Sequence, residues 1–294
     1  MSIAMDTVCF QCHLRRNLET ARKYGDEKTA TAFAKELMRV YVDLPEEFSS
    51  PELGPAASRL LQQFYGLEPD RMRKEKEESN RFVMERLDKI RDRIQKAEDP
   101  LLSALRFAIL GNYLDFAALQ GKVSFDDLEQ MLEQADGMEL DEACYQQFRD
   151  DLEKGGNVLY LTDNAGEIGF DRLFAGQISK QYPQVQITFC VRGGPTHNDA
   201  TREDAAAVQL PFPVIDNGNT VGGTVLHLLS DEAKQALDTA NVVIAKGMGN
   251  TETMYGCGYN VYYAFLVKCE RNVQFFEKPM MTPMFIRDPG KRGT

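Results

Sequence analysis

The chain has 294 residues, of which 43% are hydrophobic and 27% charged, and its formal net charge is -11. Such a charge argues against a nucleic-acid-binding protein, because phosphate backbones are bound by basic surfaces. No apolar run approaches the roughly 20 residues of a membrane helix, and the N-terminal residues do not resemble a signal peptide, so we expect a cytoplasmic protein without membrane contact.

The first half of the chain is predicted to be helical. Apolar residues recur there at spacings of three and four, without strand-like alternation. Glycine and proline breaks separate the segments, and we expect residues 1–154 to form an all-helical N-terminal region. The predicted helices cover residues 6–24, 27–42, 54–65, 74–97, 100–119, 125–135 and 140–153.

The pattern changes after Gly155–Gly156. Short runs of apolar and β-branched residues now alternate with helical stretches, from NVLYLT through VQITFCV and VVIAKG to VQFF. This alternation is typical of a parallel sheet with helices on both faces. We therefore predict an α/β fold, with a three-layer α/β/α domain and a mostly parallel sheet in residues 155–294.

The first polar junction follows the run NVLYLT, where Asp163 and Asn164 precede Gly166. Ligands of open α/β sheets bind beyond the carboxyl ends of the strands. A carboxylate beside an amide oxygen suits a hard cation such as Mg²⁺ or Mn²⁺, and the N–H groups of the next helix would favour a phosphate. Asp and Asn are also common helix N-caps, so this junction alone leaves both interpretations open.

The second junction follows VQITFCV and contains Arg192, Asn198 and Asp199. An arginine can hold a phosphate through a bidentate fork. Asn198–Asp199 repeats the amide–carboxylate pairing, and Asp199 could be a metal ligand or a general base toward water. Helix capping is again the alternative, but repetition on successive strands favours a site.

The third junction is the segment from Lys246 to Thr251, with glycines at positions 247 and 249. A lysine at a strand end, close backbone approach and the donors of Asn250 and Thr251 suit a phosphate. The segment is neither a Walker A motif nor a complete GxGxxG, so it is a loose phosphate loop.

Lys268 follows an apolar segment that begins near Tyr259 and that we predict to be helical. A lysine in that place could reach the crevice. On the residues alone, a surface lysine whose stem covers apolar neighbours is favoured.

Six cysteines in a chain of this size are expected to be thiols or metal ligands rather than a disulfide framework. Cys9 and Cys12 have CxxC spacing, which supplies half of a tetrahedral zinc site. Two core cysteines on one helix face are the alternative. A second, thiol-based site would require Cys269 to lie close to this pair.

The first three junctions together supply oxygen ligands for a cation, basic groups and amide donors. That combination predicts phosphoryl-group chemistry on a small phosphorylated metabolite. The alternatives are a carboxyl methyltransferase that uses S-adenosylmethionine, favoured by the GxG turns, and a non-enzymatic metal or thiol protein centred on the cysteines.

The segments LYLTDNAGEIGFD, RGGPTHNDATREDA, AKGMGNTE and LVKC, taken together, resemble the damage-control phosphatases, metal-dependent enzymes with an acidic-residue methyltransferase-like fold. The helical half contributes CFQC, KEKEESN and LRFAILGNYLDF to this resemblance, which covers nearly the whole chain in order. The chain is most similar to the microbial branch with an N-terminal CxxC.

The resemblance implies hydrolysis of phosphate esters of small metabolites, such as sugar phosphates or damaged cofactor intermediates. It implies a divalent cation (Mn, Co, Ni or Mg) held by Asp163, Asn164 and Asp199, with Lys268 reaching the phosphate as a fourth catalytic residue. Asn112 and Asp115 match a helical GNxxD element that faces the crevice or has a structural role. The positions that match the substrate pocket are Glu167, Arg192, Asn198, Lys246, Gly249, Asn250 and Thr251. The sequence leaves open the substrate, the preferred cation and whether the chain forms a homo-oligomer.

Overall fold

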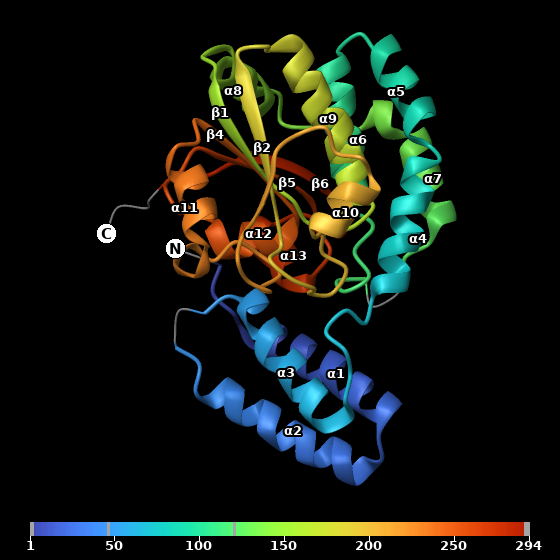
Figure 1. Cartoon of the computed structure of the whole chain (residues 1–294), viewed down its shortest axis with the longest axis vertical. Helices are drawn as coiled ribbons and strands as arrows, with labels where there is room; N and C mark the ends of the chain where they lie inside the picture. The colour runs from blue at the N-terminus through green and yellow to red at the C-terminus, as the bar shows by residue number, and fades with distance from the viewer. Residues whose placement is uncertain (1–2, 46–47, 120–121, 291–294) are drawn as a thin grey trace.

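A computed structural model of the chain describes residues 3–45, 48–119 and 122–290. Its centre is a six-stranded sheet in the order β3-β2-β1-β4-β5-β6. The first five strands pair in parallel, and β6 pairs antiparallel with β5. Helices pack on both faces of the sheet (Figure 1). The predicted α/β fold with a mostly parallel sheet is therefore confirmed.

The strands form because short runs rich in Val, Ile, Leu, Tyr and Phe are buried on both faces. Successive side chains point to opposite sides, so Tyr160 of β1 belongs to one hydrophobic cluster and Leu161 to the other. The bounds are β1 (Gly156–Leu161), β2 (Val185–Val191), β3 (Val214–Asp216), β4 (Val242–Lys246), β5 (Val261–Leu266) and β6 (Pro283–Arg287).

Three N-terminal helices, α1 (Thr7–Tyr24), α2 (Glu27–Val42) and α3 (Gly54–Tyr65), pack around a small core of their own. They lie together below the rest of the molecule in Figure 1. The side chains of Asp6 and Asp26 cap the first two helices.

Six further helices cover one face of the sheet, and their apolar side chains share a single core with the strands. They are α4 (Arg73–Met84), α5 (Leu87–Lys96), α6 (Pro100–Gly111), α7 (Phe125–Glu133), α8 (Glu142–Glu153) and α9 (Glu167–Gln181). The predicted helix 74–97 is thus two helices, and the predicted helix 100–119 ends at Gly111. It ends there because the next three amides form tighter turns and Asn112 points its side chain at the sheet.

The opposite face carries α11 (Asp231–Asp238), α12 (Gly247–Met254) and α13 (Glu270–Phe276), while α10 (Arg202–Ala207) packs at the β3 side. Three 3₁₀ turns, η1 (Ser50–Leu53), η2 (Ala135–Gly137) and η3 (Leu226–Leu228), complete the elements used below. None of the described helices is long and apolar enough to cross a membrane.

Two segments form a different type of secondary structure from the one that the sequence predicted. The apolar segment that begins near Tyr259 is strand β5, because its β-branched and aromatic residues are buried between β4 and β6. The run VQFF belongs to α13, where Phe276 packs against Phe265 of β5. Short apolar runs have no periodicity that distinguishes a strand from a helix. The secondary structure of both segments was therefore decided by tertiary packing.

Candidate active site

The loops after β1 and β2 are joined by backbone hydrogen bonds. The amide of Ala165 donates to the carbonyl of Asn198 at 2.8 Å, and the amide of Ala200 donates to the carbonyl of Asp163 at 2.7 Å. Since β1 and β2 are parallel neighbours, their carboxyl ends lie at one edge of the sheet. The two amide–carboxylate pairs of the sequence are therefore brought together.

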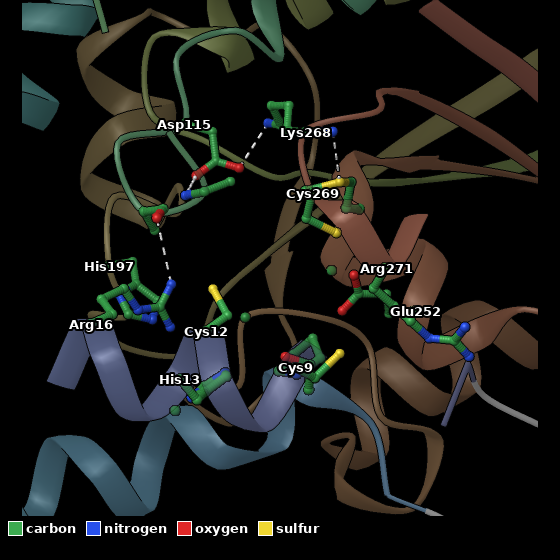
Figure 2. A pocket seen from close by; sticks show the side chains of 18 of the residues that line it. Cys9, Cys12, His13, Arg16, Asp115, His197, Glu252, Lys268, Cys269 and Arg271 are labelled. Carbon is green, nitrogen blue, oxygen red and sulfur yellow. Dashed lines mark hydrogen bonds and ion pairs between the residues drawn. The ribbon is translucent and has the colours of Figure 1, made fainter. Parts of the chain in front are cut away.

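A cavity of ≈ 430 Å³ lies at this edge, and α1 closes its other side. Asp163, Asn164, Asp199 and Lys268, the four predicted catalytic residues, all line it. Figure 2 shows Lys268 and Cys269 on one side, facing Cys12 and Arg16 of α1.

Asp163 is held in place by neutral donors. Its Oδ2 accepts from Nδ2 of Asn164 at 2.7 Å and from Nδ2 of Asn112 at 3.0 Å. Burial raises the pKa of Asp163 well above its usual range, and the like charges of Glu167 and Asp199 raise it further. The crowded carboxylates therefore favour any added positive charge.

Asp199 is oriented by Arg192, whose Nε donates to its Oδ2 at 2.7 Å. Burial raises the pKa of Asp199 to about 6, although the Arg192 guanidinium opposes this shift. Arg192 also donates through Nη1 to the Gly223 carbonyl and to Asn250, both at 3.2 Å. The guanidinium thus lies behind the carboxylate, in the wall of the pocket.

Lys268 reaches the pocket from the end of β5, and its ammonium is fixed by the helical half of the chain. Nζ lies 2.7 Å from Oδ2 of Asp115 (Figure 2). It also donates to the Asn112 carbonyl at 2.6 Å. Burial would raise the pKa of Asp115, but the charge of Lys268 and the hydrogen bonds lower it. Asp115 is therefore an ionised partner that keeps Lys268 in position.

Lys246 does not line the pocket, in contrast to what the sequence predicted. Its ammonium is fully buried and donates to Oε1 of Glu167 at 2.6 Å, to Oδ1 of Asp171 at 2.9 Å and to the Ala108 carbonyl at 2.7 Å. Burial favours the neutral amine, but the two carboxylates raise the pKa of Lys246. All three ammonium protons are used inside the protein, so this lysine supports Glu167 instead of meeting a ligand.

Of the seven predicted substrate-binding residues, Gly249 lines the cavity, and the other six lie behind its wall. These six are Glu167, Arg192, Asn198, Lys246, Asn250 and Thr251. They are buried and bind other protein groups: Asn250, for example, donates to the carbonyls of Thr162 and Lys246. These polar side chains point away from the cavity because each has a hydrogen-bond partner inside the protein, as Lys246 has on α9 and Thr251 within α12.

The helix start after β1 is also occupied. The Gly166 amide donates to Oδ1 of Asn80 at 2.7 Å, and the Asn164 amide bonds to Oε2 of Glu167 at 3.3 Å. The sequence suggested that amides at this helix start would bind a phosphate. These two amides are not free to do so, because they already bind side chains of the protein. The positive charges that line the cavity are carried by side chains, such as those of Arg16 and Lys268.

The two glycines of the third junction are required by close packing within the protein. At Gly247, where φ is 79°, an added Cβ would lie 2.0 Å from Oδ2 of Asp163. At Gly249 it would lie 1.8 Å from the carbonyl oxygen of Gly222. Their GxG spacing is explained without a nucleotide.

The residues present fit a divalent cation. Asp163, Asn164 and Asp199 offer oxygen donors, which hard cations prefer, and all three face the cavity. Oδ1 of Asp163 accepts no hydrogen bond from the described residues, and its nearest charged partner is Nη2 of Arg192 at 3.7 Å. Within the described part of the chain, no three His, Cys, Asp or Glu side chains gather to hold a metal, so a cation here would require the amide oxygen of Asn164 beside the two carboxylates.

The three thiols Cys9, Cys12 and Cys269 also line the cavity. All are free, and burial raises the pKa of Cys9 to about 11 and of Cys269 to about 12. Within the described part of the chain, these thiols do not belong to any group of three or more His, Cys, Asp or Glu side chains that could hold a metal ion. A thiol metal site here stays a prediction.

Sequence reasoning missed the contribution of α1 beyond its cysteines. His13 and Arg16 line the cavity as well, because positions 9, 12, 13 and 16 share one face of the helix. This spacing in the sequence indicates that the four residues share a helix face. Only the packing of α1 over the sheet edge shows that this face lines the cavity. Glu252, which lines the cavity, and the buried Asp171 lie in segments that the sequence analysis did single out, but neither was named as a site residue.

Known proteins similar to this chain indicate its family. The sequence profile of the damage-control phosphatase ARMT1-like domain matches residues 5–282. An uncharacterized protein of Methanocaldococcus jannaschii is 30% identical over 92% of this chain and 90% of its own length. A damage-control phosphatase of Archaeoglobus fulgidus is 29% identical over 90% of this chain and 92% of its own.

A crystal structure of a DUF89 family protein from Pyrococcus horikoshii superposes with a TM-score of 0.81 at 25% identity, covering 98% of this chain and 99% of that one. A damage-control phosphatase of the same organism is 32% identical over 56% of this chain and 58% of its own length. With its domain profile matched over nearly the whole length, the chain belongs to the damage-control phosphatase family, with an ARMT1-like domain.

Proposed function

We propose that this protein is a metal-dependent phosphatase that hydrolyses phosphate esters of small metabolites. The observation that carries the proposal is that Asp163, Asn164, Asp199 and Lys268 converge on one cavity in a chain of a phosphatase family. A methyl transfer would need neither the oxygen-rich ligand set nor a buried lysine beside it.

Asp163, Asn164 and Asp199 would hold a divalent cation, with Mn²⁺, Co²⁺, Ni²⁺ and Mg²⁺ as candidates. Such an ion would polarise the phosphate and lower the pKa of a bound water. Arg192 fixes the carboxylate of Asp199 in the direction of the cavity, and the amides of Asn112 and Asn164 fix that of Asp163. Preorganised ligands of this kind avoid a reorganisation cost during the reaction.

Lys268 would bind the non-bridging oxygens of the phosphate. Asp115 and the Asn112 carbonyl hold its ammonium in the cavity wall, so its charge is positioned before substrate arrives. A fixed positive group in a partly dry site stabilises charge that develops on the phosphate in the transition state.

The test is release of orthophosphate from a panel of phosphomonoesters by metal-free protein, to which each of the four cations is added separately. We expect activity that depends on added cation and disappears with a chelator. Lys268→Met should lower kcat, with correct folding checked by circular dichroism. Absence of phosphate release with every cation and ester would refute the proposal, and methyl transfer that survives the chelator would support the alternative enzyme.

A further inference from the structure

A second cavity of ≈ 280 Å³ adjoins the active-site cavity. Its walls come from α1, α3 and the loops after β2 and β3, together with Arg71 just before α4. The two cavities share His13, Arg16, Gly54 and His197. Figure 2 shows Arg16 and His197 side by side, above His13 on α1. The two cavities are therefore adjacent, and these side chains lie between them.

All the formally charged side chains that line the second cavity are basic. It contains three arginines, Arg16, Arg59 and Arg71, and no aspartate or glutamate. Within the described residues, none of the three forms an ion pair with a carboxylate, and Arg16 makes only a long 3.5 Å hydrogen bond to the Ala117 carbonyl. The chain as a whole carries a formal charge of -11. Like charges gathered in a hollow repel one another unless an anion joins them.

Neutral donors complete this lining. The ring of His13 is buried, and its Nδ1 has no hydrogen-bond partner among the described residues. Burial and the charge of Arg16 lower the pKa of His13 to about 3. The His13 ring is therefore neutral at physiological pH and can donate one hydrogen bond, and the ring of His197 belongs to the same lining. The hydroxyls of the lining are those of Ser58, Thr196 and Thr220.

We propose that the second cavity binds a second phosphate group of the substrate, so that the preferred substrates are small metabolites with two phosphates. Guanidinium groups hold phosphate through paired hydrogen bonds, and three of them match an ion with several charged oxygens. The shared wall assigns this phosphate to the substrate molecule, whose two phosphates would then lie on either side of His13, Arg16 and His197. The inference rests on the proposed phosphatase function, whose substrate class it narrows.

The experiment compares kcat/KM for the monophosphates and the bisphosphates of linear alkanediols of increasing length. We expect one range of lengths in which the bisphosphate is the better substrate by about tenfold or more, as for hydrogen bonds to charged groups. Arg71→Gln and Arg59→Gln should bring this ratio close to one while kcat/KM for the monophosphate stays unchanged, because neither residue lines the active-site cavity. The matched control is Arg81→Gln, an exposed arginine of α4 outside both cavities, which should keep the ratio.

Binding of alkane bisphosphonates and monophosphonates, measured by calorimetry without turnover, separates this inference from the proposed function. Tighter binding of the bisphosphonate that is lost in Arg71→Gln supports the second phosphate site even if no ester is hydrolysed. An active enzyme with a ratio near one at every length overturns the inference, as does a ratio that both arginine variants retain. Equal binding of the two phosphonates overturns it as well.

Discussion

Asn112, which follows the last residue of α6, donates from Nδ2 to Oδ2 of Asp163 at 3.0 Å. The same amide group lies 3.0 Å from Oε2 of Glu167, and its Oδ1 accepts from the Leu266 amide of β5 at 3.0 Å. A single fully buried side chain thus connects the helical half of the chain to two strand ends of the sheet.

Asn112→Asp should be more damaging than Asn112→Ala, although aspartate has the same shape as asparagine. The new carboxylate would lose the donors to Asp163 and Glu167 and add a like charge beside them. A buried uncompensated charge costs about 3–5 kcal/mol, whereas a lost hydrogen bond costs about 1–3 kcal/mol. Urea unfolding of both variants measures the difference, and an aspartate variant as stable as the alanine variant would contradict the predicted role.

Asp163→Asn should lower kcat by about 10²-fold or more without lowering stability in the presence of a chelator. The activity falls because a charged ligand is removed. The stability does not fall because the neutral amide relieves repulsion from Glu167 and Asp199, the repulsion that contributes to the raised pKa of Asp163. Steady-state rates and thermal unfolding check both parts. Asp92→Asn, an exposed change on α5, serves as the control, and wild-type turnover in Asp163→Asn would remove this residue from the metal assignment.

Lys246→Met should destabilise the protein by about 3–5 kcal/mol, because it leaves two buried carboxylates without their cation. The partners are Glu167 and Asp171, at 2.6 and 2.9 Å from Nζ. The double variant Lys246→Met/Asp171→Asn should recover part of the loss, since one of the two charges is then gone. Urea unfolding gives the coupling energy, and strictly additive losses would show that the lysine does not act through Asp171.

Glu252 should make the cation-free protein less stable as the pH rises. Burial raises the pKa of Glu252 from 4.5 to about 7, so the folded state holds this proton more tightly than the unfolded state does. The contribution is fully present below pH 4.5 and is lost as the pH rises to about 7.

Glu252→Gln should therefore reduce the fall in unfolding free energy between pH 5 and pH 8 by up to about 3 kcal/mol. The glutamine can still accept from Nδ2 of Asn272, as the glutamate does at 3.1 Å. Glu77→Gln, an exposed change on α4, should leave the pH dependence unaltered. An identical slope in Glu252→Gln and the wild type would show that this carboxyl does not titrate as described.

The sequence by itself determined the fold class and the two amide–carboxylate pairs at strand ends, Asp163–Asn164 and Asn198–Asp199. Alternating apolar runs and helices specify a buried parallel sheet, and parallel strands place their carboxyl ends at one edge, so Asp163 and Asp199 had to be neighbours. Local periodicity could not decide the type of short runs such as residues 261–266, since a buried strand and a buried helix both read as continuous apolar sequence.

Only the tertiary structure decided which charges face the cavity. Lys246 and Lys268 both lie at the ends of parallel strands, yet Lys246 is satisfied by Glu167 and Asp171 behind the wall, whereas Lys268 is held at the surface of the cavity by Asp115. These partners are 75 to 153 residues away in the chain, from Lys246–Asp171 at the near end to Lys268–Asp115 at the far end. A buried charged side chain points toward the group that compensates its charge. Spacing in the sequence cannot reveal such a partner when it is distant in the chain and only folding brings it near.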